Sequence, residues 1–226
     1  MSVGNQETVI FLSLRKGKLC RIVPEGTPKS YPRTKNDQSI IYELRYNYIE
    51  GHITDIVTKK TPYVEDGKET IIRSWVLTVI DESWAVFKVE INYNSSYAKQ
   101  FLNRIPNIDF SEQVRLLVGE SPKENDPTKM QGWLSVSQNR TKVPAAYTKE
   151  EPGRLPQLDI TEQDGKTIYN DDKQMAYYEE LVQFHKVAFR HPDGTYTYPA
   201  IIPETKPETT GTSIETAKQA EDDLPF

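Results

Sequence analysis

The last six residues, 221–226, combine residue types that suit capture by another protein. Three carboxylates precede an apolar Leu-Pro-Phe, and Phe226 also carries the terminal carboxylate. An aromatic ring can fill an apolar pocket while the carboxylate pairs with a Lys or Arg beside it. Pro225 restricts the backbone, which lowers the ordering cost of binding. A solvated acidic terminus is the alternative interpretation. We therefore predict a protein-docking site, able also to fold back onto a basic groove of its own chain, at Asp222, Asp223, Leu224, Pro225 and Phe226.

This ending resembles the acidic tip of the bacterial single-stranded DNA-binding proteins and their phage counterparts, with Leu224 where another aliphatic residue is often seen. The resemblance covers six residues. It implies an OB-fold, a disordered linker, and a tip that recruits replication, recombination and repair proteins. Residues 204–220 have the composition of such a linker, because they contain no aromatic residue and one large aliphatic, Ile214. They bury too little apolar surface to fold, so we expect them to be disordered.

Charge and composition set broad limits on the function. The chain of 226 residues has a net charge of -5. Residues 204–226 hold six acidic and two basic residues, a net of -4, which leaves -1 for residues 1–203. A nearly neutral body can bind nucleic acid only through a local basic groove. The single cysteine, Cys20, excludes an intrachain disulfide framework, and no apolar run approaches the ~18 residues of a membrane span. We expect a protein of the bacterial cytoplasm, encoded by the bacterium or by an infecting phage.

The order of predicted elements is that of an OB-fold, a five-stranded Greek-key barrel that commonly binds oligonucleotides. Gly51 lies inside the first predicted strand, where it permits a bend that lets one strand serve two sides of the barrel. Ser95 or Ser96 can cap the helix, which Pro106 ends. The pattern predicts strands at 40–58, 70–80, 84–92, 113–120 and 131–138, with a helix at 97–104 between the third and the fourth.

Further elements flank this predicted barrel. A hairpin is expected at 8–23, an extended crossing at 144–156, a hairpin around Asp164-Gly165, a helix at about 171–188 and a hairpin at 191–194. The whole is expected to be mainly β. It divides into an OB-fold core with an N-terminal hairpin at 1–143, an appended α+β subdomain at 144–203, and a disordered linker with its acidic tip at 204–226. The subdomain covers a barrel surface or builds an oligomer contact, and the oligomeric state stays open.

Aromatic residues interleaved with basic ones are the candidate contacts to single-stranded DNA, because rings stack on bases and cations follow phosphates. Strand alternation points Trp84 and Trp133 away from the apolar face. Trp75 shares its face with apolar residues, which leaves a core role open for it. The candidates are Trp84, Trp133, Trp75, Tyr46, Tyr48, Arg45, Arg73, Lys88, Lys59, Lys60, Arg140 and Lys142.

Catalytic patterns are absent from the sequence. It has no phosphate-binding loop and no nucleophile elbow, and three scattered histidines with one cysteine form no metal-ligand cluster. We expect no enzyme, metal or cofactor. The function expected is sequence-independent binding of single-stranded DNA with recruitment of partners through the tip. The alternatives are an OB-like adaptor that binds proteins, which salt dependence would distinguish, and an RNA-binding OB protein, which competition with RNA would distinguish.

Overall fold

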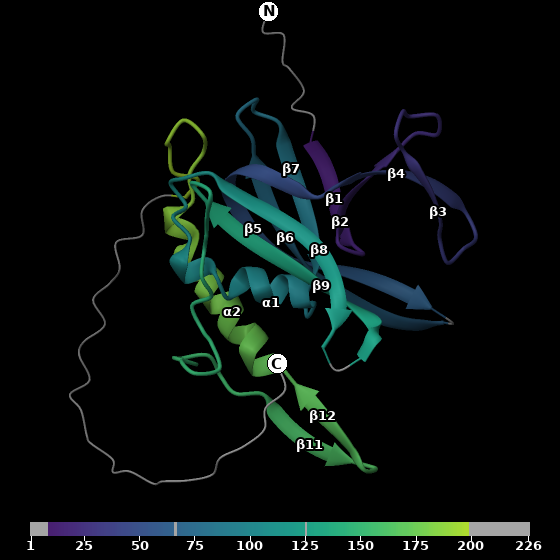
Figure 1. Cartoon of the computed structure of the whole chain (residues 1–226), viewed down its shortest axis with the longest axis vertical. Coiled ribbons are helices and arrows are strands. Elements are labelled where there is room, and N and C mark those ends of the chain that lie inside the picture. Colours follow the sequence, from purple (N-terminus) through teal and green to yellow (C-terminus); the bar gives the residue numbers. More distant parts are fainter. Residues whose placement is uncertain (1–8, 66, 125, 199–226) are drawn as a thin grey trace, which may run out of the picture.

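Strands make up most of the chain, which confirms the expected mainly-β class (Figure 1). The computed structural model describes residues 9–65, 67–124 and 126–198, so the predicted linker and tip lie outside it. Its elements are β1 (Val9–Arg15), β2 (Lys18–Val23), β3 (Tyr31–Thr34), β4 (Ile40–Tyr46), β5 (Tyr48–Glu65), β6 (Lys68–Ile80), β7 (Val86–Asn92), α1 (Ser96–Leu102), η1 (Ile105–Asn107), β8 (Val114–Lys123), β9 (Asp126–Gln138), β10 (Thr141–Lys142), β11 (Asp159–Gln163), β12 (Lys166–Asn170), α2 (Asp172–His185) and η2 (Lys186–Ala188).

The described strands pair mainly in one sheet, in the order β10-β9-β8-β5-β6-β7-β1-β2-β4-β3, while β11 and β12 pair only with each other. The five strands from β9 to β7 are those expected to form the barrel, and α1 connects β7 to β8. Closing them would require β7 to pair with β9. In the described chain β7 instead pairs in parallel with β1, and β9 pairs with β10. The expected five-stranded barrel is therefore not confirmed.

Gly51 lies where β5 passes from one partner strand to another. Residues 48–51 pair with β8, and the chain pairs with β6 from His52 onward, with a register shift after Ile53. A Cβ atom at Gly51 would lie 2.4 Å from the carbonyl oxygen of Ile80. Only glycine permits this close approach, so β5 can pair with β8 up to this point and with β6 beyond it. The expectation that this bend serves two sides of a closed barrel is not confirmed.

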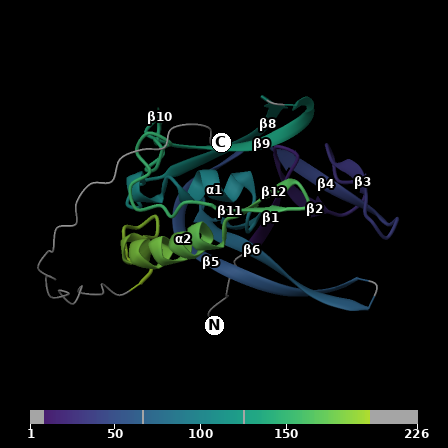
Figure 2. The ribbon, with the colours of Figure 1, turned by 90° about the horizontal axis from the view of Figure 1, so that it is seen from below.

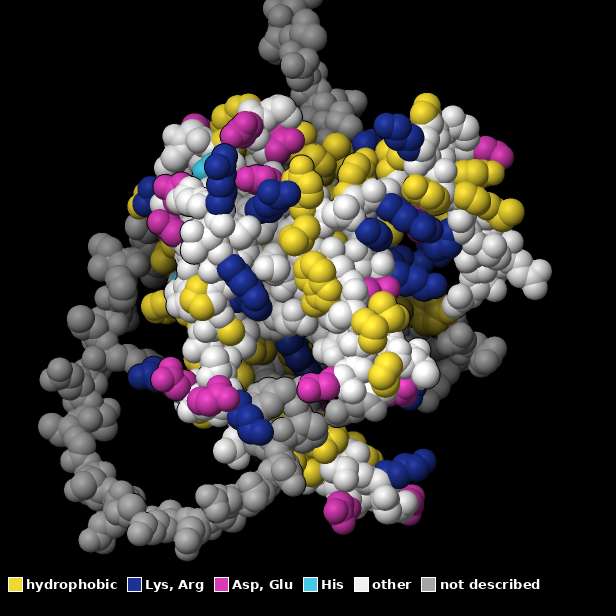
Figure 3. Space-filling view, viewed as in Figure 1, with side chains coloured by type: hydrophobic (Ala, Val, Ile, Leu, Met, Phe, Trp, Pro, Cys, Tyr) yellow, Lys and Arg dark blue, Asp and Glu magenta, His cyan; other side chains and the backbone are white. Residues whose placement is uncertain are grey.

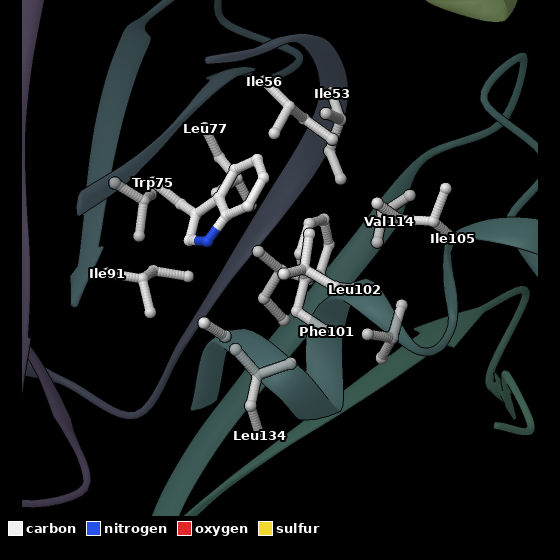
Figure 4. Packing of buried hydrophobic residues seen from close by; sticks show 14 of the residues in the cluster. Ile53, Ile56, Trp75, Leu77, Ile91, Phe101, Leu102, Ile105, Val114 and Leu134 are labelled. Atoms are coloured by element: carbon white, nitrogen blue, oxygen red, sulfur yellow. The ribbon is translucent and has the colours of Figure 1, made fainter. Parts of the chain in front are cut away.

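The hydrophobic core fills the space enclosed by the strongly bent sheet. Figure 2 shows α1 between the layer of β8 and β9 and the layer of β5 and β6. Ser95 caps α1 as expected, accepting a hydrogen bond from the N–H of Ala98 at 3.2 Å. Phe101 and Leu102 of α1 point toward Trp75 (Figure 4). Buried residues of α2 belong to the same cluster, so this helix packs on the same core as the sheet: Met175, Tyr178 and Val182.

Several element boundaries differ from the predicted ones. The expected strand at 40–58 is interrupted at Asn47, and the strand expected from Trp84 begins at Val86. Much of the polar segment 121–130, between the strands expected at 113–120 and 131–138, is also paired, because the register of β8 with β9 continues to Pro122 and Met130. Cross-strand hydrogen bonds thus override the local loop preference of this polar segment. The hairpin at Asp164-Gly165 is confirmed by β11 and β12, and the last hairpin by a bridge between residues 190 and 196.

His185, at the end of α2, is expected to make stability depend on pH. Its ring lies 6.1 Å from that of Phe110 and 5.2 Å from that of Phe184 (centroid distances), and burial lowers its pKa below the ordinary 6.5. The unfolded chain then binds the proton more readily, so the free energy of unfolding falls as the pH drops below about 6.5. The variant His185→Gln should lose less stability between about pH 7.5 and about pH 5 than the natural chain. Urea unfolding at both pH values measures this, and equal losses would contradict it.

No helix in the described ranges is long and apolar enough to cross a membrane.

Candidate nucleic-acid interface

The side of the sheet that faces away from the core forms one continuous surface from β5 to β2, called here the outer face. Cross-strand register places its side chains together. Lys88 of β7 is paired with Phe11 of β1 on one side and with Thr78 of β6 on the other. Ser13 of β1 is paired with Cys20 of β2. Paired residues project to the same side of a sheet. The outer face includes Val9, Phe11, Ser13, Cys20, Ile22, Val57, Lys59, Ser74, Val76, Thr78, Lys88 and Glu90.

Phe11 is the most exposed aromatic side chain on the outer face. It is 69% exposed, while its neighbours in β1 on the other side, Ile10 and Leu12, pack against the core. The cross-strand partner of Phe11 is Lys88, whose Nζ donates a hydrogen bond to the neutral hydroxyl of Thr78 at 3.2 Å. An exposed ring beside an ammonium group can stack on a base while the cation contacts a phosphate.

A hollow of about 870 Å³ lies on the outer face, with Phe11 in its lining. Three basic residues and one acidic residue line it: Arg21, Lys59, Lys88 and Glu90. Glu90 accepts a hydrogen bond from Ser74 at 2.7 Å and lies 3.5 Å from Lys59. The lining keeps an excess of positive charge, which favours a polyanion.

A second hollow, of about 920 Å³, has the opposite charge balance. Ile10 and Leu12 contribute to its lining together with Tyr46 and Tyr48. Its charged residues are one basic and three acidic: Arg21, Glu50, Asp81 and Glu82. Phosphates are disfavoured there by like-charge repulsion, so the geometry favours the outer face over the surface that carries Tyr46 and Tyr48.

Trp75 and Arg73 do not form the surface platform that was expected of them. Trp75 is 2% exposed, and its ring stacks on Tyr93 at a centroid distance of 5.4 Å. Arg73 pairs with Glu179 of α2 and lies over the Tyr93 ring at 3.8 Å. Burial, with the hydrogen bond to Glu179, raises the pKa of Tyr93 to about 12. This is a correction: Trp75 belongs to the core, and Arg73 joins the sheet to α2.

The other two tryptophans lie apart from the outer face. Trp84 is 53% exposed, with a φ of 64° in the turn before β7, so the expected strand alternation does not apply to it. Trp133 projects away from the buried Leu134, as expected, and its ring lies across Gly119, where a Cβ atom would be 2.2 Å from it. Neither residue joins a basic cluster with Lys88, and contact of either with DNA stays a prediction.

The remaining predicted residues are dispersed. Arg45 lies on the face of β4 that continues the outer face, because it pairs with Cys20. Tyr48 is covered by Arg115, whose guanidinium carbon lies 4.0 Å from the ring centroid. Three other basic residues are exposed outside the outer face. Lys60 is on the side of β5 opposite Lys59, Arg140 lies in the turn after β9, and Lys142 lies in β10.

Sequence reasoning missed Phe11 and Ile22, which are 69% and 61% exposed. A signal for Phe11 was present, because residues 9–15 alternate and Ile10, Leu12 and Leu14 suffice for a core face. Only the pairing of β1 with β7 could place that ring beside Lys88.

The described residues contain no group of three or more His, Cys, Asp or Glu side chains arranged to hold a metal ion. In comparisons with known proteins, no family model, no curated protein and no solved structure matches this chain.

Proposed function

We propose that this chain is a sequence-independent single-stranded DNA-binding protein that holds the strand on its outer face. The observation that carries the proposal is an exposed aromatic ring, Phe11, directly beside Lys88 in a hollow with a net positive lining. Stacking on an aromatic ring contributes about 1–3 kcal/mol per base and accepts any base, because every base has a π-face. Binding without base-edge hydrogen bonds is therefore independent of sequence.

The order of the strands supports an OB-type architecture. Strands β5, β6 and β7 are followed by α1, β8 and β9, with β8 returning to pair with β5. In OB-folds the second and third strands carry the oligonucleotide-binding face. Here these are β6 and β7, which bring Val76, Thr78, Lys88 and Glu90 to the outer face. We propose a variant of this fold in which β1 occupies the edge of β7.

The acidic ending completes the proposal. Residues 222–226 repel DNA by charge and fit a basic pocket with an apolar floor, so we propose that they recruit replication, recombination or repair proteins. A tether holds such a tip at high effective concentration near the bound strand. The setting proposed is the cytoplasm of a bacterium, with the chain encoded by the host or by a phage, and without an enzymatic activity of its own.

Salt dependence of binding tests the proposed function. A fluorescent oligo-dT of about 30 nucleotides exceeds the site of one OB domain, and its anisotropy reports binding. The affinity should fall steeply with salt, and each phosphate neutralised should contribute about -0.7 to the slope of log K against log[salt]. The variant Lys88→Gln should lower the magnitude of that slope by about 0.7, whereas the control Lys166→Gln, in β12, should not change it.

No binding at low salt would contradict the proposal, provided that a chain lacking residues 221–226 also fails to bind. The truncated chain tests whether residues 221–226 prevent binding by occupying the DNA-binding groove of the same chain. If oligo-U displaces the labelled oligo-dT as well as unlabelled oligo-dT does, the protein binds RNA as well as DNA, because the 2′-hydroxyl then does not lower the affinity.

A further inference from the structure

We propose that β3 and β4 extend the DNA path beyond the outer face and end it at a stacking platform formed by Tyr31, Arg33 and Arg45. This inference rests on the proposed function, which concerns the face carried by β6, β7 and β1. The platform belongs to strands outside the five-strand core, and it adds a second, separate place where a base is held.

Tyr31 supplies the ring of this platform. It is 53% exposed on β3, the last strand of the sheet. The guanidinium carbon of Arg45 lies 4.9 Å from the centroid of the ring, over one of its faces. The other face of an exposed ring is free to stack on a base, and a cation on the far side strengthens such an arrangement.

Glu43 holds the two cations of the platform in place. Its side chain is 2% exposed, and it pairs with the Nε atom of Arg33 and lies 3.7 Å from the Nε atom of Arg45. One buried carboxylate between two guanidinium groups leaves an excess of one positive charge. Because the carboxylate orients both groups, their remaining N–H donors are pre-organised for a phosphate, which guanidinium binds in a bidentate manner.

The platform is continuous with the outer face. In the register of β2 with β4, Cys20 pairs with Arg45 and Ile22 pairs with Glu43, so these side chains share one side of the sheet. Ile22, 61% exposed, lies between Phe11 and the platform. Three strand spacings separate β1 from β3, about 14 Å in all, which is the length of roughly four stacked nucleotides.

The charge of this region fits a polyanion. Residues 15–45 contain eight Lys and Arg and three Asp and Glu, a net of +5, in a chain whose net charge is -5. In the view of Figure 3, Lys and Arg side chains gather beside hydrophobic ones over β3 and β4. A basic surface that continues a proposed DNA path favours the same strand as its occupant over an acidic protein, because the phosphate chain can follow both.

The test is a site-size titration of the full chain with poly-dT, comparing the natural protein with Tyr31→Ala. Removal of one stacking ring should weaken binding to a long oligo-dT by about 5- to 140-fold, and should shorten the stoichiometric site by about four nucleotides. Tyr31→Phe keeps the ring and should restore both values. Tyr169→Ala, which removes a comparably exposed ring (48%) from β12, should change neither.

Two outcomes separate this inference from the proposed function. If the natural chain binds and Phe11→Ala weakens it, while Tyr31→Ala leaves affinity and site size unchanged, the platform is wrong and the proposed function stands. If neither the natural chain nor the chain lacking residues 221–226 binds oligo-dT, both the inference and the proposed function fail. A structural loss alone would lower the urea midpoint of Tyr31→Ala without shortening the site of the folded protein.

Discussion

Replacement of Phe11 by Ala should weaken the binding of oligo-dT by about 5- to 140-fold, the range that follows from losing one base stack of about 1–3 kcal/mol. The reason is that Phe11 is the most exposed aromatic ring on the outer face, and it lies beside Lys88 in the basic hollow. Fluorescence anisotropy at low salt measures the change. The fold should be unaffected, since a side chain that is 69% exposed contributes little to the core.

A matched control exists in the same chain. Phe184 is 73% exposed on α2, and Phe184→Ala removes the same ring from a surface outside the proposed DNA path. That variant should bind oligo-dT as the natural chain does, and Phe11→Trp should keep or raise the affinity, because a larger ring stacks at least as well. If Phe11→Ala and Phe184→Ala bind equally well, the outer face is not the DNA site.

Replacement of Trp75 by Ala should lower the free energy of unfolding by about 3–5 kcal/mol, the usual cost of truncating a large buried aromatic side chain. Trp75 is 2% exposed and stacks on Tyr93, which in turn lies under Arg73 and donates a hydrogen bond to Glu179 of α2. The truncation leaves a cavity at the junction of β6 with the helix. Urea unfolding followed by circular dichroism measures the loss.

Two variants make this prediction specific. Trp84→Ala removes the same side chain from an exposed turn, where it is 53% accessible, and should change the free energy of unfolding far less. Trp75→Phe should cost less than Trp75→Ala, since most of the ring volume remains and the buried indole Nε1 has no hydrogen-bond partner among the described residues. Equal destabilisation by Trp75→Ala and Trp84→Ala would contradict the burial of Trp75.

Local features of the chain were predictable because their signals lie within a few residues. The cap at Ser95, the bend at Gly51 and the hairpin at Asp164-Gly165 depend on turn and capping chemistry that acts over short sequence separations. The mainly-β class followed from alternation. The proposed site was only partly predictable, since Lys59, Lys88 and Arg45 belong to the outer face or its continuation, whereas the aromatic residues predicted to act beside them do not.

The sequence by itself determined which residues share a side of each strand, the concentration of basic charge in residues 15–45, and the acidic and apolar residues at 222–226 on which the proposed docking depends. Only the tertiary structure decided that the side of β6 with Trp75 faces the core, and which side chains of different strands meet. Trp75 is buried because α1 and α2 cover its side of β6, and Phe11 meets Lys88 because β1 pairs with β7. Both contacts join segments far apart in the sequence. Alternation along a strand separates its residues into two faces, but it does not show which segment covers either face. The proposed interface therefore depends on long-range pairing, which no local pattern encodes.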